Sequence, residues 1–149
     1  MQTVSIYTYS GVRGLKRQNA PVAYVLSVVT GAGERTRKAV ETVKDATENQ
    51  SELIVLIKAL ERMNKPCNLK IYTESAHVST AIEQGWLARW KSNGWKNVKG
   101  NEIANAEEWK RLDELMEQHE VEVFFKEEHS YRKWLKEEVR KARKENKVV

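Results

Sequence analysis

Residues 47–73 read TENQSELIVLIKALERMNKPCNLKIYT, and this stretch decides the fold because it joins two different periodicities. Apolar side chains recur at i, i+3, i+4 and i+7 from Leu53 onward, which predicts an amphipathic helix over residues 48–63. Thr47 precedes this run and is the expected N-cap of the helix. Residues 68–73 (NLKIYT) then predict a strand. A strand, a helix and a returning strand together form a βαβ unit.

Three strands are predicted on the N-terminal side of this unit. The first two are residues 3–9 (TVSIYTY), which are rich in β-branched and aromatic side chains, and residues 22–29 (VAYVLSVV). The third is residues 35–43, in which apolar and polar side chains alternate weakly. Residues 10–21 contain two glycines and a proline and are predicted to form a loop. Because short connections join neighbouring strands, these three strands are expected to form a meander.

Helices and one further strand are predicted on the C-terminal side. The expected elements are a helix over 75–91 with a possible break near Gly85, a polar loop over 92–104, a helix over 106–117, a strand over 120–126 and a helix over 130–146. The complete order predicts an α/β sandwich with a mixed sheet. At 149 residues, the chain is expected to form one domain over residues 1–149.

The composition narrows the class of protein. The formal net charge is +5 and charged residues make up 32% of the chain, which is compatible with a polyanionic partner. The lone cysteine, Cys67, excludes an internal disulfide and cysteine-based zinc clusters. Neither a signal peptide nor a long apolar run is present in the sequence. We therefore expect a cytoplasmic protein that has no membrane segment and is a monomer.

Five segments carry a resemblance to a known family. They are Ile6-Tyr-Thr8, residues 47–53 (TENQSEL), 70–77 (KIYTESAH), 85–95 (GWLARWKSNGW) and 105–119 (NAEEWKRLDELMEQH). In this order they resemble the bacterial type 1 ribonuclease H family. The resemblance implies a ribonuclease H-like fold, in which a five-stranded mixed sheet of order 3-2-1-4-5 is flanked by helices and carries a basic helical protrusion.

The resemblance also implies an activity. The family cleaves the RNA strand of RNA–DNA hybrids with four carboxylates and two divalent metal ions, usually Mg²⁺ or Mn²⁺. Two such cations activate water and stabilise the leaving oxygen of the phosphate. Hard cations need oxygen ligands, which clustered carboxylates supply.

The first three carboxylate positions can be carried over residue by residue. Tyr9 stands where the family has its first aspartate, the one that contacts both metal ions. The second position is retained as Glu52. The third is Glu74, where the family prefers aspartate, and the extra methylene displaces the carboxylate. Glu52 and Glu74 are therefore the candidate catalytic residues and metal ligands of this chain.

The fourth carboxylate and the family's mobile histidine are harder to place. Counting from Lys126 without gaps gives Glu138, whereas aligning on the apolar spacing gives Lys136, and we favour Glu138. His129 follows Glu128, which occupies the counted position of the histidine. The candidate catalytic set is thus Glu52, Glu74, Glu138 and His129.

Residues 84–101 favour nucleic-acid binding. This segment has no acidic residue and contains the cations Arg89, Lys91, Lys96 and Lys99 together with Trp86, Trp90 and Trp95. Cations neutralise phosphates, and aromatic rings pack on sugars or bases. We expect Trp90 to anchor the protrusion in the core, whereas the resemblance implies that Trp86 contacts the DNA strand. The resemblance also implies contacts to nucleic acid from Thr47, Asn49, Ser75 and Asn105, in addition to the basic and aromatic residues of 84–101.

Three functions remain open from the sequence. The first is a divergent ribonuclease H that binds RNA–DNA hybrid or another nucleic acid and cleaves the RNA strand weakly, with Mg²⁺ or Mn²⁺. The second is a non-catalytic nucleic-acid-binding module, without a cofactor, in which Tyr9 fills the former metal site. The third is a protein-interaction scaffold. Tyr9 favours the second over the first, and the basic protrusion favours either over the third.

Overall fold

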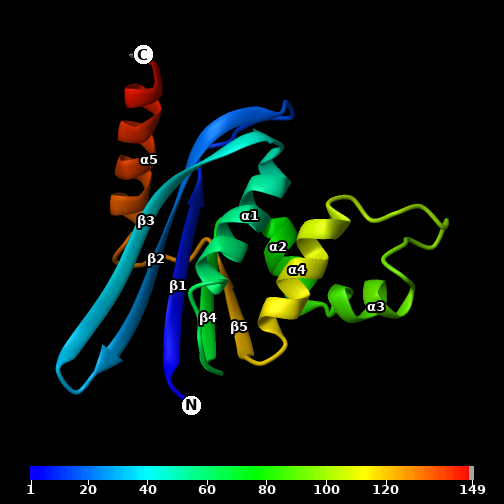
Figure 1. Ribbon diagram of the computed structural model, residues 1–149, viewed down its shortest axis with the longest axis horizontal. Helices are drawn as coiled ribbons and strands as arrows, with labels where there is room; N and C mark the ends of the chain where they lie inside the picture. The colour runs from blue at the N-terminus through cyan, green and yellow to red at the C-terminus, as the bar shows by residue number, and fades with distance from the viewer. Residues whose placement is uncertain (148–149) are drawn as a thin grey trace.

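The computed structural model describes residues 1–147 and contains one five-stranded sheet with helices on both faces (Figure 1). The elements are β1 (Thr3–Ser10), β2 (Gln18–Thr30), β3 (Gly33–Ala46), α1 (Glu48–Leu60), β4 (Asn68–Thr73), α2 (Ala76–Glu83), α3 (Trp86–Ser92), α4 (Ala106–Met116), β5 (Glu120–Phe125) and α5 (Arg132–Lys147). The sheet order is β3-β2-β1-β4-β5, as predicted. β1, β2 and β3 pair antiparallel, whereas β4 is parallel to β1 and to β5.

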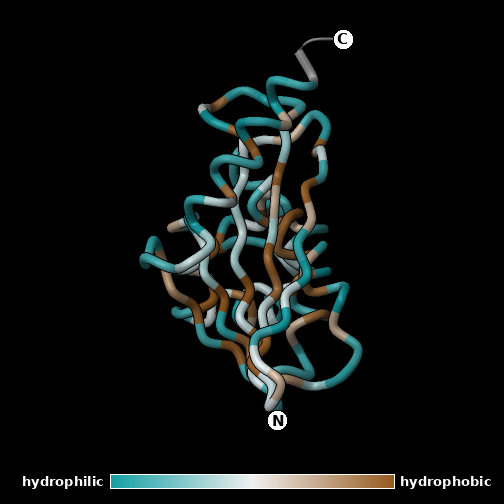
Figure 2. The backbone as a smooth tube through the Cα atoms, turned by 90° about the vertical axis from the view of Figure 1, so that its left-hand side faces the viewer, coloured by the Kyte–Doolittle hydropathy of each residue, from teal (hydrophilic) through white to brown (hydrophobic). Residues whose placement is uncertain are grey.

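The helices divide between the two faces of the sheet. α1, α2 and α4 cover one face, α5 covers the other, and α3 extends away from the sheet (Figure 1). The alternating burial of β1 follows from this arrangement, since Val4 and Ile6 are buried beneath α1. Hydrophobic residues lie mainly along the strands in the middle of the molecule, and the outer turns are hydrophilic (Figure 2). The largest fully buried side chains are Trp109, Tyr24, Ile6, Leu53, Leu56, Leu60, Leu69, Ile71, Leu112 and Leu135.

The predicted amphipathic helix is confirmed as α1. The hydroxyl of Thr47 accepts a hydrogen bond from the amide of Gln50 at 3.2 Å, so Thr47 caps the helix as expected. Leu53, Leu56 and Leu60 are buried. The helix ends at Leu60 rather than at the predicted Met63.

β2 begins four residues before the predicted start at Val22. The expectation of a loop through Pro21 was wrong because tertiary pairing uses this segment. Ala20 pairs with Val43 of β3, and the carbonyl of Pro21 accepts a hydrogen bond from the amide of Gly11 at 2.8 Å. Proline retains its carbonyl acceptor although it has no amide donor.

The predicted break near Gly85 is confirmed. Gly85 has φ 68°, a left-handed backbone conformation that favours glycine, and it separates α2 from α3. Beyond α3, the polar segment predicted as a loop turns back on itself, with an isolated bridge between Lys96 and Glu102. The resulting protrusion carries the Trp and Lys residues of 84–101. No helix within the described residues 1–147 is long and apolar enough to cross a bilayer.

Gly11→Ala is expected to destabilise the protein by about 1–3 kcal/mol, because a β-carbon at this position over-packs a filled space. That atom would lie 2.7 Å from the carbonyl oxygen of Pro21 and 2.9 Å from Cγ1 of Val139 in α5. Urea unfolding measures the change. Gly31→Ala is the matched control, since nothing lies within 4 Å of its added β-carbon. Equal stability of the two variants would contradict the prediction.

Candidate functional site

A polar cavity of about 290 Å³ lies where β1 and β4 end, beside the first turn of α1 and the start of α5. The carboxyl ends of parallel strands are a common place for sites in sheets flanked by helices. The lining residues are Tyr9, Arg13, Glu48, Glu52, Glu74, Lys126, Arg132 and Lys136. The fold therefore brings together three of the sequence-predicted positions, Tyr9, Glu52 and Glu74.

Glu52 is the most buried acid of this cavity. It is 4% exposed, and its Oε2 has no hydrogen-bond partner among the described residues. Burial raises the pKa of the Glu52 carboxyl from its ordinary 4.5 to about 7, against the opposing effect of the positive Arg13. Glu48 and Glu74 add smaller increases in the same direction. Glu52 therefore exchanges its proton near neutral pH.

Glu52→Gln is expected to stabilise the protein by about 3 kcal/mol above pH 7 and to change little below pH 4.5. The wild-type carboxyl is protonated in both states at low pH. Between pH 4.5 and 7 only the unfolded chain ionises, so the free energy of unfolding falls as pH rises. The neutral amide removes this loss. Urea unfolding at pH 4 and pH 8 measures the difference, and a destabilised variant at pH 8 would refute it.

Glu74 is engaged by a cation. Its Oε1 accepts a hydrogen bond from Nη2 of Arg132 at 2.9 Å, and Nη1 of Arg132 donates to Glu128 at 2.7 Å. The Arg132–Glu74 side chains are 23% and 16% exposed, so water screens this pair only partly. An ion pair in this position competes with any metal for the Glu74 carboxylate.

Tyr9 sits between the cavity and α5. Its ring packs against the small cluster of Ala23, Val25, Leu135 and Val139. The guanidinium carbon of Arg13 lies 5.1 Å from the ring centroid, within the range of a cation–π contact. The phenol thus lines the cavity at the position where the resemblance predicts a metal-bridging carboxylate.

The structure places Lys136, rather than the favoured Glu138, at the cavity. Leu135 and Val139 are buried beneath α5 and fix the rotation of the helix about its axis. Residues 136 and 138 are about 200° apart around a helix, so they face different sides. Glu138 instead forms an ion pair with Lys141 at 3.3 Å. The alignment on apolar spacing, which gives Lys136, thus agrees with the residue that lines the cavity.

His129 lies near the cavity but is not one of its lining residues. Its ring packs on Tyr7 with centroids 4.4 Å apart, and its Nδ1 accepts a hydrogen bond from the amide of Tyr131 at 3.1 Å. Burial lowers the pKa of the His129 imidazole. These contacts hold the His129 ring against the face of the sheet that α5 covers.

The side chains of the cavity do not fit a two-metal centre. Within residues 1–147, no three acidic, histidine or cysteine side chains are grouped closely enough to hold a metal ion. Glu52 is buried, Glu74 is paired with Arg132, and Lys136 adds a positive charge where a ligand would be needed. Hard cations require several oxygen ligands at once.

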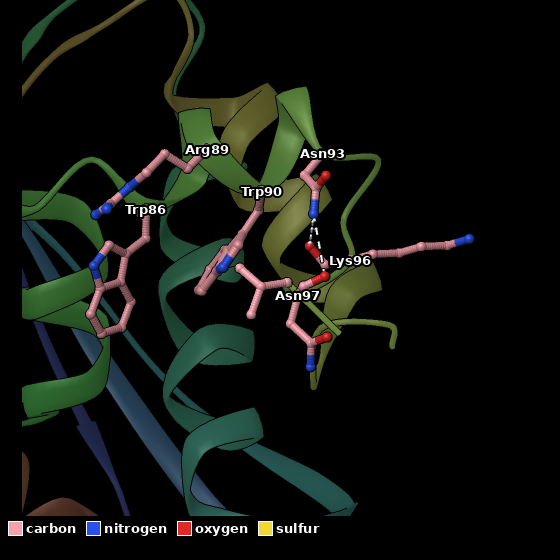
Figure 3. Close-up of a pocket in the computed structure, with 7 residues that line it drawn as sticks. Trp86, Arg89, Trp90, Asn93, Lys96 and Asn97 are labelled. Carbon is pink, nitrogen blue, oxygen red and sulfur yellow. Dashed lines mark hydrogen bonds between the residues drawn. The ribbon is translucent and has the colours of Figure 1, made fainter. Parts of the chain in front are cut away.

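A second hollow lies on the protrusion and is lined by Trp86, Arg89, Trp90, Asn93, Lys96, Asn97 and Val98 (Figure 3). The side-chain amide of Asn93 donates to the carbonyls of Lys96 and Asn97 at 2.7 and 3.3 Å, which closes the turn after α3. The side chains of Arg89 and Trp86 line the same hollow, whereas Lys96 points away from it (Figure 3).

The tryptophans link the protrusion to the core. The ring centroids of Trp86 and Trp90 are 5.8 Å apart, and Trp90 contacts the buried Trp109 at 5.2 Å. Trp90 and Trp95 pack against the core and remain half-buried. Arg89, Lys96 and Lys99 are exposed, and the exposed Lys91 lies 3.4 Å from Asp113. The protrusion is therefore anchored to the core by its tryptophans, and its cationic side chains are exposed to solvent.

Four predicted contacts to nucleic acid lie at helix starts. Ser75 is buried and caps α2, because its hydroxyl accepts a hydrogen bond from the amide of Val78 at 3.1 Å. Asn49 is exposed in the first turn of α1, which Thr47 caps. Asn105 has φ 60°, and its carbonyl accepts a hydrogen bond from the amide of Trp109 at 3.0 Å. Thr47 and Ser75 therefore have structural roles as caps.

Sequence reasoning did not assign Glu48, Arg13 and Arg132 to the cavity. The spacing of Glu48 and Glu52 is i, i+4, which places both on one helix face and was a usable signal. Arg13 and Arg132 come from a loop and from the first turn of α5. No local pattern marks their approach, because Arg13 is oriented by the carbonyls of Ser10 and Val12, and the place of Arg132 depends on how α5 packs.

Comparison with known proteins agrees with this architecture. The RNase H family matches residues 1–141. Ribonuclease H of Clostridium botulinum strain Hall is 36% identical over 130 residues, which cover 87% of this chain and 86% of that protein. Ribonuclease H of Acetivibrio thermocellus is 32% identical over 121 residues, covering 81% and 79%.

Solved structures share the fold. LC9-RNase H1, a type 1 RNase H with the type 2 active-site motif, superposes with a TM-score of 0.77 at 18% identity, over 95% of this chain and 72% of that one. LC11-RNase H1, solved in complex with RNA/DNA hybrid, superposes with a TM-score of 0.58 at 18% identity, over 93% of this chain and 98% of that one. From the family match and these relatives, the chain belongs to the ribonuclease H family.

Proposed function

We propose that this chain binds RNA–DNA hybrid or a related duplex and cleaves the RNA strand weakly or not at all. The observation that carries the proposal is the make-up of the cavity, in which Tyr9 and Lys136 accompany Glu52 and an Arg132–Glu74 ion pair. The metal-dependent chemistry of the family needs a cluster of free carboxylates at this point. The Tyr9 phenol and the Lys136 ammonium group supply no carboxylate to such a cluster.

The protrusion supports binding. Its cations extend from half-buried tryptophans, and residues 84–101 contain no acid that would repel phosphates. Hybrid duplexes are recognised largely through backbone and 2′-OH contacts in a wide minor groove, which suits a basic aromatic surface. LC11-RNase H1, which has the same fold, was solved in complex with RNA/DNA hybrid.

Loss of cleavage is supported by more than one substitution. Tyr9 removes the carboxylate that would bridge two metal ions, and its ring is packed against α5 and beneath Arg13. Lys136 then places a like charge beside any bound cation. The favoured form of the proposal is therefore a binding module without catalysis, and a slow Mg²⁺- or Mn²⁺-dependent nuclease is the alternative.

The test is a paired assay of binding and cleavage on one labelled RNA–DNA hybrid. We expect salt-sensitive binding and no cleavage with Mg²⁺ or Mn²⁺. Tyr9→Asp alone is expected to remain inactive because the positive charge of Lys136 persists in the cavity. Tyr9→Asp combined with Lys136→Asp is expected to gain cleavage. Turnover by the wild-type protein that disappears in Glu52→Gln would contradict the loss of activity.

A further inference from the structure

The cavity around Tyr9 carries more positive than negative groups. Four cations line it, namely Arg13, Lys126, Arg132 and Lys136, against the three carboxylates of Glu48, Glu52 and Glu74. The cations come from the loop after β1, the end of β5 and the first turns of α5. Elements distant in the sequence therefore converge to present positive charge at one point.

The acids of the cavity present little free negative surface. Glu52 is 4% exposed, and the carboxylate of Glu74 is held by Arg132 at 2.9 Å. Glu48 is the remaining acid and is half-buried in the first turn of α1. A metal cation would meet one accessible carboxylate here, whereas an anion would meet several donors.

The cations keep donor capacity for a ligand. Lys136 is exposed and forms no ion pair within the described part of the chain. Lys126 is exposed too, and its Nζ lies 5.4 Å from the Phe125 ring centroid. Nη1 of Arg13 donates to the carbonyls of Ser10 and Val12 at 2.7 Å, which orients the guanidinium at the cavity wall.

Tyr9 adds a donor that a carboxylate lacks. A neutral phenol has an O–H group that donates to an anionic oxygen, whereas an ionised aspartate only accepts. Guanidinium groups bind phosphate oxygens through paired N–H donors, and ammonium groups bind them as point charges. The Tyr9 phenol together with Arg13, Lys126 and Lys136 is thus a donor set for phosphate, whereas Arg132 is held by Glu74 and Glu128.

We propose that this cavity binds a backbone phosphate of the nucleic acid directly on protein cations, without a divalent metal. The inference rests on the proposed function and deepens it, because it names the group that the former catalytic centre holds. Lys136 and Lys126, which are exposed, contribute the charge that metal ions supply elsewhere in the family. The cavity then serves as an anchor for the duplex in addition to the protrusion.

The experiment measures the affinity of the full chain for a labelled RNA–DNA hybrid by fluorescence anisotropy, in EDTA and in Mg²⁺. We expect binding in EDTA at least as tight as in Mg²⁺. Lys136→Ala is expected to weaken binding about tenfold, the usual loss for one charge-assisted contact. It also lowers the slope of log K against log salt by about 0.9, the loss of one phosphate contact.

Lys141→Ala is the matched control, because Lys141 is an exposed lysine of the same helix that pairs with Glu138. It is expected to leave affinity and salt slope unchanged. Wild-type binding that requires Mg²⁺, or equal affinities of the Lys136 and Lys141 variants, would overturn the phosphate anchor while leaving hybrid binding intact. No hybrid binding by the wild-type protein in either buffer would overturn the proposed function and this inference together.

Discussion

Neutralising the protrusion is expected to lower the affinity for RNA–DNA hybrid on the order of a hundredfold or more in low salt. The variant replaces Arg89, Lys91, Lys96 and Lys99 with glutamine. These cations are exposed on a segment without acidic residues, and three of them, Arg89, Lys96 and Lys99, form no ion pair within the described residues, whereas Lys91 pairs with Asp113 of α4. If each contacts one phosphate, the slope of log K against log salt falls by about 3.6.

A control variant that loses the same charge elsewhere on the surface distinguishes a specific role of the protrusion from an effect of net charge on affinity. The control replaces four exposed cations outside the protrusion, namely Arg35 and Arg37 of β3, Lys65 of the turn before β4, and Lys70 of β4. Glutamine at these four positions is expected to change the affinity by less than about threefold, since distant exposed charges are screened. Equal losses in the two variants would show that net charge, rather than the protrusion, governs binding. Titrations by anisotropy at several salt concentrations provide both quantities.

Trp109→Ala is expected to destabilise the protein by about 3–5 kcal/mol. The Trp109 side chain is 0% exposed in the core beneath α4, and its ring contacts Trp90 and His77 with centroids 5.2 and 5.6 Å apart. Removing it opens a cavity and detaches the base of the protrusion. A loss of this size is a large fraction of the 5–15 kcal/mol that is typical of folded domains.

Two further variants sharpen this result. Trp134→Ala removes a half-buried tryptophan on α5 and is expected to cost clearly less than Trp109→Ala. Trp109→Phe keeps an aromatic ring and removes a buried Nε1–H that has no partner in the described structure, so a smaller loss is expected. Denaturant unfolding of the three variants gives the order. A Trp109→Ala loss below that of Trp134→Ala would contradict the assignment of Trp109 to the core.

The local elements of the fold could be predicted because their signals are local. The apolar spacing from Leu53 marked α1, Thr47 marked its start, and Gly85 marked the break between α2 and α3. The start of β2 could not be predicted in this way. Pro21 and its neighbours look like a loop, and they become strand because β3 pairs with them.

The candidate site likewise contains residues that the sequence predicted and residues that only the packing of the helices placed there. The sequence brought Tyr9, Glu52 and Glu74 together through the resemblance to the ribonuclease H family, whose sheet order this chain shares. Only the tertiary structure decided that Lys136 rather than Glu138 faces them, and that Arg132 pairs with Glu74. The physical reason is the burial of Leu135 and Val139, which sets the rotation of α5 on the sheet and therefore the charge of the cavity.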